Sequence, residues 1–216
     1  MANNCNNYLY ISSISEDNLK RLSDFFDKVK HQGRHSAMLS FYKVAVELSH
    51  RDEFKDFELT SEEAFWKETF DVYDLFGSKW FEFEYEGDET ISGDSAWGPM
   101  LPFFQILADE FEFSCDGNYE ESGNLIYGTF SIDDGNFCDN SMEKWEYIIK
   151  ETDPFGEIEY YLEDGMLDSD DLKEIESYMT QSDFKEVCDM ITTSEQKSID
   201  NKEEREEWLI LKPKEY

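Results

Sequence analysis

The sequence predicts an α+β fold in which an antiparallel sheet carries helices on one face. Aromatic and acidic residues alternate in one segment, where Phe81, Phe83 and Tyr85 lie between Glu82, Glu84 and Glu86. A period of two is typical of a strand with one buried and one exposed face. Elsewhere, apolar residues spaced by three and four predict amphipathic helices that cover the apolar side of such a sheet.

The chain begins with a predicted strand followed by a predicted helix. Tyr8–Ile11 is rich in residues that favour strands. Ser15 is a predicted N-cap, and Gly33 is predicted to end the helix. Between them an apolar stripe of helical period comprises Leu19, Leu22, Phe25, Phe26 and Val29.

Residues 36–76 are predicted to form a helical insertion between this helix and the next strand. One apolar stripe comprises Met38, Leu39, Phe41, Tyr42, Ala45, Val46 and Leu48. A second stripe comprises Phe65, Trp66, Phe70 and Tyr73. Both are typical of amphipathic helices.

The segment after the insertion predicts a hairpin, a helix and two further strands. The hairpin strands are Lys79–Glu86 and Glu89–Trp97, with a turn at Gly87 and Asp88. Pro99 suits the first turn of a helix that runs to Phe111. The last two strands are Phe111–Tyr119 and Asn124–Ile132. The predicted order is β-α-insertion-β-β-α-β plus an extra strand, which is the split βαβ pattern of ferredoxin-like folds.

Beyond residue 135 the pattern changes to short helical stripes among acidic residues. Trp145 and Ile148 predict a helix that stops near Pro154, while Leu172 and Ile175 belong to a later one. We therefore predict a ferredoxin-like domain over residues 1–135, with its helical insertion at about 36–76. Residues 136–216 are predicted to be an acidic, mainly helical C-terminal extension.

The charge is large, negative and unevenly distributed. The chain of 216 residues has a net charge of −33, yet its 39% hydrophobic and 16% aromatic residues are ample for a core. From Trp80 to Glu143 there are 16 acidic residues and no lysine or arginine. Like charges repel when no internal cation pairs with them. We therefore expect these carboxylates to bind an external cationic partner.

The same charge excludes several classes of protein. Phosphates and anionic membranes would be repelled, so direct nucleic-acid binding and membrane binding are not expected. No apolar run approaches the roughly 18 residues that a membrane span needs. The N-terminus has no signal-peptide pattern, and the four cysteines form no C-x-x-C pair. The sequence thus predicts a cytoplasmic protein with reduced thiols. Its oligomeric state is not predicted.

No catalytic, cofactor or metal site is predicted. His31 and His35 have the spacing of a helical metal pair, but Gly33 lies between them and no acidic or cysteine ligand is adjacent. Cys5 has no nearby charge to lower its pKa, so a buried structural role is favoured over a nucleophile. No acid-flanked glycine meets the spacing of an EF-hand loop, and the cluster of Asp168, Asp170 and Asp171 is predicted to cap the helix through Leu172 and Ile175 instead. The protein is therefore predicted not to be an enzyme.

Several short motifs resemble a known family, the plasmid-, phage- and bacterial-genome-encoded proteins with a YubB-type ferredoxin-like domain. The N-terminal motif is Met1-Ala2-Asn3-Asn4-Cys5-Asn6-Asn7, where Asn4 replaces the family's usual tryptophan. The later motifs are Gly77-Ser78-Lys79-Trp80, Trp97-Gly98-Pro99 and Tyr119-Glu120-Glu121-Ser122-Gly123. The resemblance covers roughly residues 1–30 and 76–135. It implies a ferredoxin-like fold and a setting of host–virus conflict, and it implies no catalytic residues.

Two functional hypotheses follow. The first is a non-catalytic acidic protein that binds and inhibits a basic nucleic-acid-binding protein, such as a host defence nuclease complex, by nucleic-acid mimicry. The alternative is a small-ligand-binding or enzymatic ferredoxin-like protein of unknown substrate. For the first hypothesis the candidate partner-binding residues of the hairpin are Glu82, Glu84, Glu86, Asp88 and Glu89. The candidates in the extension are Glu157, Glu159, Glu163, Asp164, Asp168, Asp170 and Asp171.

Overall fold

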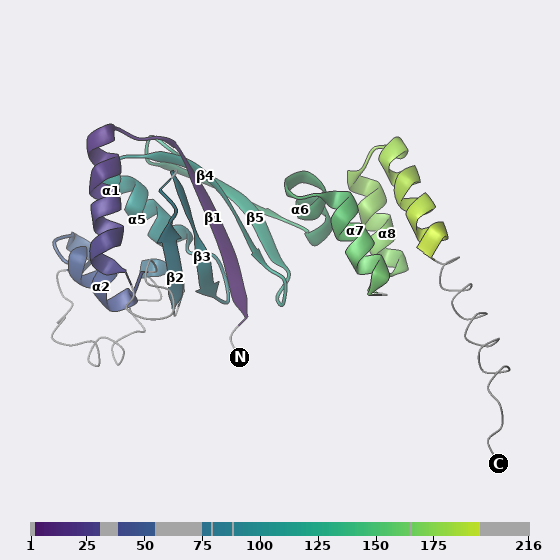
Figure 1. Cartoon of the computed structure of the whole chain (residues 1–216), viewed down its shortest axis with the longest axis horizontal. Helices are drawn as coiled ribbons and strands as arrows, with labels where there is room; N and C mark the ends of the chain where they lie inside the picture. The colour runs from purple at the N-terminus through teal and green to yellow at the C-terminus, as the bar shows by residue number, and fades with distance from the viewer. Residues whose placement is uncertain are drawn as a thin grey trace, which may run out of the picture. The chain divides into compact units, whose positions relative to one another are not determined.

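A computed structural model describes residues 3–30, 39–54, 75–78, 80–87, 89–164 and 166–194. Most of the predicted insertion, including its second apolar stripe, lies outside the described residues, as do Gly33 and Asp88. The chain divides into two compact units, Met1–Glu143 and Lys144–Tyr216. Each unit is described by itself (Figure 1).

The first unit contains a six-stranded sheet in the order β2-β3-β1-β4-β5-β6, with every neighbouring pair antiparallel. Its strands are β1 Asn4–Ser13, β2 Phe81–Tyr85, β3 Thr90–Ala96, β4 Ser114–Glu121, β5 Ile126–Asp133 and β6 Asn136–Met142. In β1 to β4 the chain follows the β-α-β-β-α-β path, with β1 between β3 and β4. The predicted ferredoxin-like α+β fold and the antiparallel hairpin of β2 and β3 are therefore confirmed.

Three helices of the described ranges pack on one face of this sheet: α1 Glu16–Val29, α2 Phe41–Glu47 and α5 Leu101–Phe111 (Figure 1). A short 3-10 turn, η1, follows α2 at Asp52–Phe54. Inward-facing side chains of the strands meet the apolar stripes of the helices, and the resulting core is rich in phenylalanine. The rings of Phe81 and Phe103 lie 5.0 Å apart between centroids, and those of Phe104 and Phe130 are stacked at 5.2 Å.

The elements differ from the predictions at four places. The helix α1 ends at Val29, with Lys30 as its C-cap, and does not reach Gly33. The first strand is longer than Tyr8–Ile11, because Cys5 and Asn7 continue its alternate burial toward the N-terminus. The predicted strand at Phe111 begins only at Ser114, since α5 ends at Phe111 and Glu112 takes a left-handed conformation with φ of 50°. The strand β6 was not predicted. Its side chains are exposed on both faces except at Met142, so no apolar alternation marks it.

A buried hydrogen-bonded set joins β1, β3 and the start of α5. The Nδ2 of Asn7 donates to the carbonyl of Cys5 and to the Oγ of Ser95, both at 2.8 Å. The Oδ1 of Asn7 accepts from the backbone N–H of Met100 at 3.1 Å. The hydroxyl of Ser95 in turn donates to the carbonyl of Gly98 at 2.7 Å. Burying the Asn7 amide is tolerated because both of its ends are satisfied.

The described part of the second unit is helical, as predicted for the extension, whereas residues 136–142 of the predicted extension form β6 of the sheet. Its helices are α6 Lys144–Glu151, α7 Pro154–Glu163 and α8 Ser169–Tyr178, and residues 181–194 are also helical. A small core contains Trp145, Ile158, Ile175 and Val187, all fully buried. The indole N–H of Trp145 donates to the Oδ1 of Asp171 at 2.7 Å, which ties α6 to α8. Among the described residues, no helix has the length and apolar character needed to cross a membrane.

The Asn7 set gives a direct test of the fold. Asn7→Ala leaves the Met100 N–H and the Ser95 hydroxyl without this partner in a buried site, so we expect a loss of about 1–3 kcal/mol in the free energy of unfolding. Asn6→Ala is the matched control, because Asn6 is the neighbouring residue on the exposed face of β1. It should cost less than about 0.5 kcal/mol. Equal losses for the two variants in urea denaturation would contradict this role of Asn7.

Candidate functional site

The face of the sheet opposite α1, α2 and α5 is the candidate site. No described helix of the first unit packs on it. Because side chains alternate along each strand, the residues between the buried positions project from this face. Its carboxylates come from three strands and from the residue that follows β2. We call it the acidic face and define it by Glu82, Glu84, Glu86, Asp94, Asp116 and Glu120.

One row of the acidic face crosses four strands. Glu82 of β2 is the register partner of Asp94 in β3, and Asp94 is the partner of Asn6 in β1. Asn6 is in turn the partner of Glu120 in β4 and donates to its Oε1 at 3.3 Å. Like charges directly opposite each other on neighbouring strands destabilise a sheet. The pair Glu82 and Asp94 therefore costs folding free energy.

The next two rows contain the remaining carboxylates and two tyrosines. Glu84 is the register partner of Ser92, whose hydroxyl donates to the Oε1 of Glu86 at 2.7 Å. Tyr8 lies opposite Ser92 on the other side of β3. Tyr10 lies opposite Asp116 of β4. The acidic face is thus a sheet surface of carboxylates, amides and hydroxyls with two aromatic rings at its centre.

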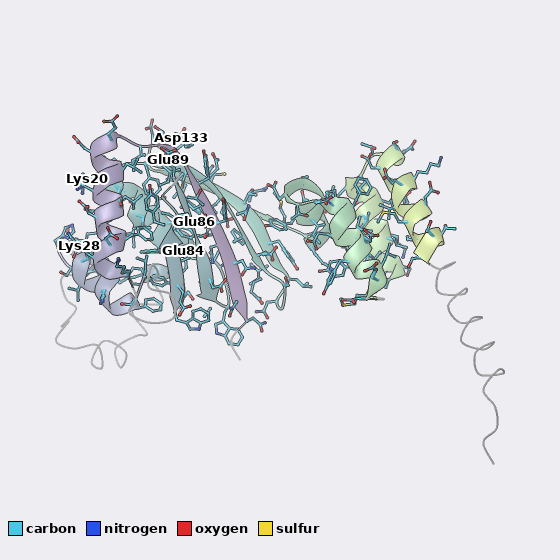
Figure 2. All side chains as sticks on the ribbon, in the orientation of Figure 1. Lys20, Lys28, Glu84, Glu86, Glu89 and Asp133 are labelled. Carbon is cyan, nitrogen blue, oxygen red and sulfur yellow. The ribbon has the colours of Figure 1, made fainter. Side chains whose placement is uncertain are left out.

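The lysines and arginines that the structure describes in the first unit lie on its helical side. Figure 2 shows Lys20 and Lys28 on α1, away from Glu84 and Glu86 at the sheet. The ion pairs of this unit join Lys20 to Asp24, Arg21 to Glu110, Lys28 to Glu47, Lys30 to Asp27 and Arg51 to Glu110. Within the described ranges, no lysine or arginine pairs with a carboxylate of the acidic face. Among the described residues of the first unit, the ion pairs made by lysine and arginine lie on the helical side and none lies on the acidic face.

The structure places the predicted hairpin residues in different surroundings. Glu82, Glu84 and Glu86 all belong to the acidic face. Glu89 lies in the turn between β2 and β3, with φ of 69°, and its carbonyl accepts from the N–H of Ile11 at 2.8 Å. Asp88 lies outside the described residues.

Three of the predicted acids in the second unit have structural contacts. The Oδ1 of Asp168 accepts from the N–H groups of Asp170 and Asp171 and caps α8, as predicted for this cluster. These backbone hydrogen bonds lower the pKa of Asp168 below its usual value. Asp171 also accepts from Trp145, and Asp170 pairs with Lys173 at 2.6 Å.

The other four predicted acids of the second unit lie on α7 or at its C-terminal end. Glu157, Glu159, Glu163 and Asp164 are all exposed. The Asp164 carboxylate accepts a hydrogen bond from Tyr160, which raises the pKa of that tyrosine. These four carboxylates belong to the second unit and form a separate candidate surface.

Five residues of the acidic face and its centre were not among the predicted site residues: Tyr8, Tyr10, Asp94, Asp116 and Glu120. The signal for the tyrosines was present in the alternation of the first strand. The three acids lie on β3 and β4, which contact β1 from both sides. Their grouping depends on strand order, which local periodicity does not contain.

The sequence offers Cys5 as a candidate nucleophile and the pair His31 and His35 as candidate metal ligands. Desolvation raises the pKa of Cys5 to about 12, so its thiol is protonated at neutral pH, as expected for a structural residue. His31 and His35 lie outside the described residues. Within the described part of the chain, no three His, Cys, Asp or Glu side chains are grouped as a metal site.

Residues 65–162 match the family described as "Ferredoxin-like domain in Api92-like protein". The match covers less than half of the chain, begins before β2 and ends within α7. It agrees with the strand order and supports a ferredoxin-like domain, and it does not support the YubB-type name. Comparisons with curated proteins and with solved structures find no match.

The burial of two of the four cysteines predicts how many thiols react in the native protein. Cys5 and Cys115 are buried, each with a pKa raised to about 12 by desolvation, whereas Cys138 and Cys188 are exposed. We expect two thiols per native chain to react rapidly with DTNB at pH 8 and the other two only after denaturation. The Cys138→Ser, Cys188→Ser double variant should lose the fast phase. Three or more fast thiols in the native protein would contradict this assignment.

The like-charge pair predicts a stabilising substitution. Asp94→Asn removes the repulsion with Glu82 and keeps an acceptor for the Nδ2 of Asn4, which lies 3.3 Å from the Oδ2 of Asp94. We expect the free energy of unfolding to rise by about 0.2–1 kcal/mol at low salt. Screening should shrink the gain as salt is added.

Glu47→Gln is the matched control for this variant, because Glu47 pairs with Lys28 at 2.8 Å. It should give no gain in urea denaturation. A stabilisation of both variants would show that overall charge, and not the opposition of Glu82 and Asp94, sets the effect.

Proposed function

We propose that this chain is a non-catalytic interaction protein whose acidic face binds a basic nucleic-acid-binding protein and inhibits it. The observation that carries the proposal is the sorting of charge in the first unit. Described cations pair with acids on the helical side, while the six carboxylates of the acidic face have no described cationic partner. A surface of this kind attracts a cationic groove and speeds its association.

Nucleic-acid mimicry is the proposed mode of inhibition. Alternate residues along a strand are about 6.6 Å apart and neighbouring strands about 4.8 Å apart, so the acidic face presents a two-dimensional array of negative charge. A cationic channel that binds a phosphate backbone would meet a comparable density of charge. Occupation of that channel by the acidic face would exclude the nucleic acid.

The target class rests on the motif resemblance. We propose that the chain belongs to the YubB-type proteins, which are encoded by phages and mobile elements. Its target would then be a host defence complex. Three of the motifs that carry the resemblance supply hydrogen-bonding groups to the fold. They are the buried side chains of Asn7 and Ser78 and the partly buried carbonyl of Gly98. The motifs therefore coincide with structural requirements of this sheet.

The experiment uses tagged full-length chain as bait in bacterial extract, followed by inhibition assays on the retained protein. We expect a basic nucleic-acid-binding protein that is released by duplex DNA or by salt. A charge-reversal variant should weaken binding about 10- to 100-fold, since exposed ion pairs contribute up to about 1 kcal/mol each. It replaces four acids of the acidic face: Glu82→Lys, Glu84→Lys, Asp94→Lys and Glu120→Lys.

The matched control reverses four exposed acids of the second unit: Glu157→Lys, Glu159→Lys, Glu163→Lys and Asp164→Lys. It changes the net charge by the same amount and should leave binding within about threefold of the wild type. If only the control reversal abolishes binding, the second unit holds the site. Retention of no basic protein, or inhibition unaffected by either reversal, would refute the proposed function.

A further inference from the structure

Two tyrosines occupy the centre of the acidic face. Tyr8 and Tyr10 are alternate residues of β1 and remain 44% and 50% exposed. In the described part of the chain, neither ring contacts another aromatic ring and neither hydroxyl has a hydrogen-bond partner. A strand with neighbours on both sides does not require two large exposed rings for its own stability. Exposed aromatic side chains of this kind often belong to binding surfaces.

Carboxylates surround both rings. Asp116 is the direct cross-strand neighbour of Tyr10. Asp94 and Glu120 are the partners of Asn6, so each is one diagonal step from Tyr8. Diagonal neighbours on one face of a sheet lie about 7–8 Å apart, which is within reach of a long side chain. A cation above either ring is therefore also within reach of a carboxylate.

This combination selects arginine among cations. The planar guanidinium stacks on an aromatic ring and, with its edge, donates two parallel hydrogen bonds to a carboxylate. The lysine ammonium is a compact, strongly hydrated charge that does not make both contacts in one geometry. The two tyrosines are about 6.6 Å apart along the strand, and arginines at alternate positions of an extended segment have the same spacing.

Two other occupants conflict with the charge of the face. Single-stranded nucleic acid stacks on exposed aromatics, but it also needs cations along its backbone, and the described residues of the acidic face supply none. A second copy of the chain would bring a second set of carboxylates against the first. Both would be repelled, whereas a cationic segment is attracted.

We propose that the acidic face binds an extended, arginine-rich segment of the partner protein, with Tyr8 and Tyr10 stacking on alternate guanidinium groups. Asp94, Asp116 and Glu120 accept hydrogen bonds from the same groups. This inference rests on the proposed function and specifies the chemistry that the acidic face recognises.

The test measures binding of two fluorescent peptides to the full-length chain. One peptide alternates arginine with serine over twelve residues, and the other replaces every arginine with lysine. We expect the arginine peptide to bind about fivefold or more tightly than the lysine peptide, because each exposed cation–π contact contributes a factor of about two to five. The Tyr8→Leu, Tyr10→Leu double variant should lose this preference and keep the charge-dependent binding.

Matched variants separate stacking from general effects. The Tyr8→Phe, Tyr10→Phe variant keeps the rings and should keep the preference for arginine. Tyr160→Leu removes a 55% exposed tyrosine of the second unit and should change nothing. Circular dichroism verifies that each variant is folded.

The possible failures are distinguishable. If the wild type binds both peptides equally, or the leucine variant keeps the preference, this inference is wrong while the proposed function stands. If the wild type binds neither peptide at low salt, the proposed function fails as well. Tight binding of a labelled oligothymidine strand would overturn both.

Discussion

The packing of helices against one face of the sheet is the constraint on which the rest of this structure depends. The strict alternation of β1 sends Cys5, Asn7, Leu9 and Ile11 into the core, and this register determines which side chains of β3 and β4 can face the helices. A shift by one residue would exchange the two faces completely. The Asn7 amide adds to this requirement, because its hydrogen bonds to Ser95 and Met100 form only in this register.

Because the core is complete on the helical side, the composition of the opposite face is largely free of folding requirements. The chain uses that freedom for carboxylates and retains a cost in Glu82 opposite Asp94. On the helical side, where charge could equally be left unpaired, Lys28 and Arg21 pair with Glu47 and Glu110. This difference between two sides of one unit is a stronger argument for a functional surface than the net charge of −33 alone.

The second unit shows why acidic composition by itself does not define a site. Asp168 and Asp171 form a capping box, and Asp171 also joins α8 to Trp145 of α6. Acids near a helix N-terminus stabilise the helix through its unpaired N–H groups. These carboxylates therefore have a sufficient structural reason to be present. Among the described residues of the acidic face, by contrast, Asp94, Glu120 and Glu86 accept only exposed hydrogen bonds, from Asn4, Asn6 and Ser92.

The sequence by itself determined the element types of β1 to β5, α1 and α5, because period-two and helical stripes report burial locally, as in Phe81–Tyr85 and in α1. It also determined that the extension is helical and that Asp168 caps a helix. It missed β6, whose exposed side chains leave no apolar alternation. Only the tertiary structure decided that Glu82, Asp94, Asp116 and Glu120 share one face with Tyr8 and Tyr10. That grouping depends on β1 lying between β3 and β4, where it pairs with residues about 80 to 115 positions away in the sequence. The hydrophobic core selects this pairing, and the local sequence pattern does not encode it.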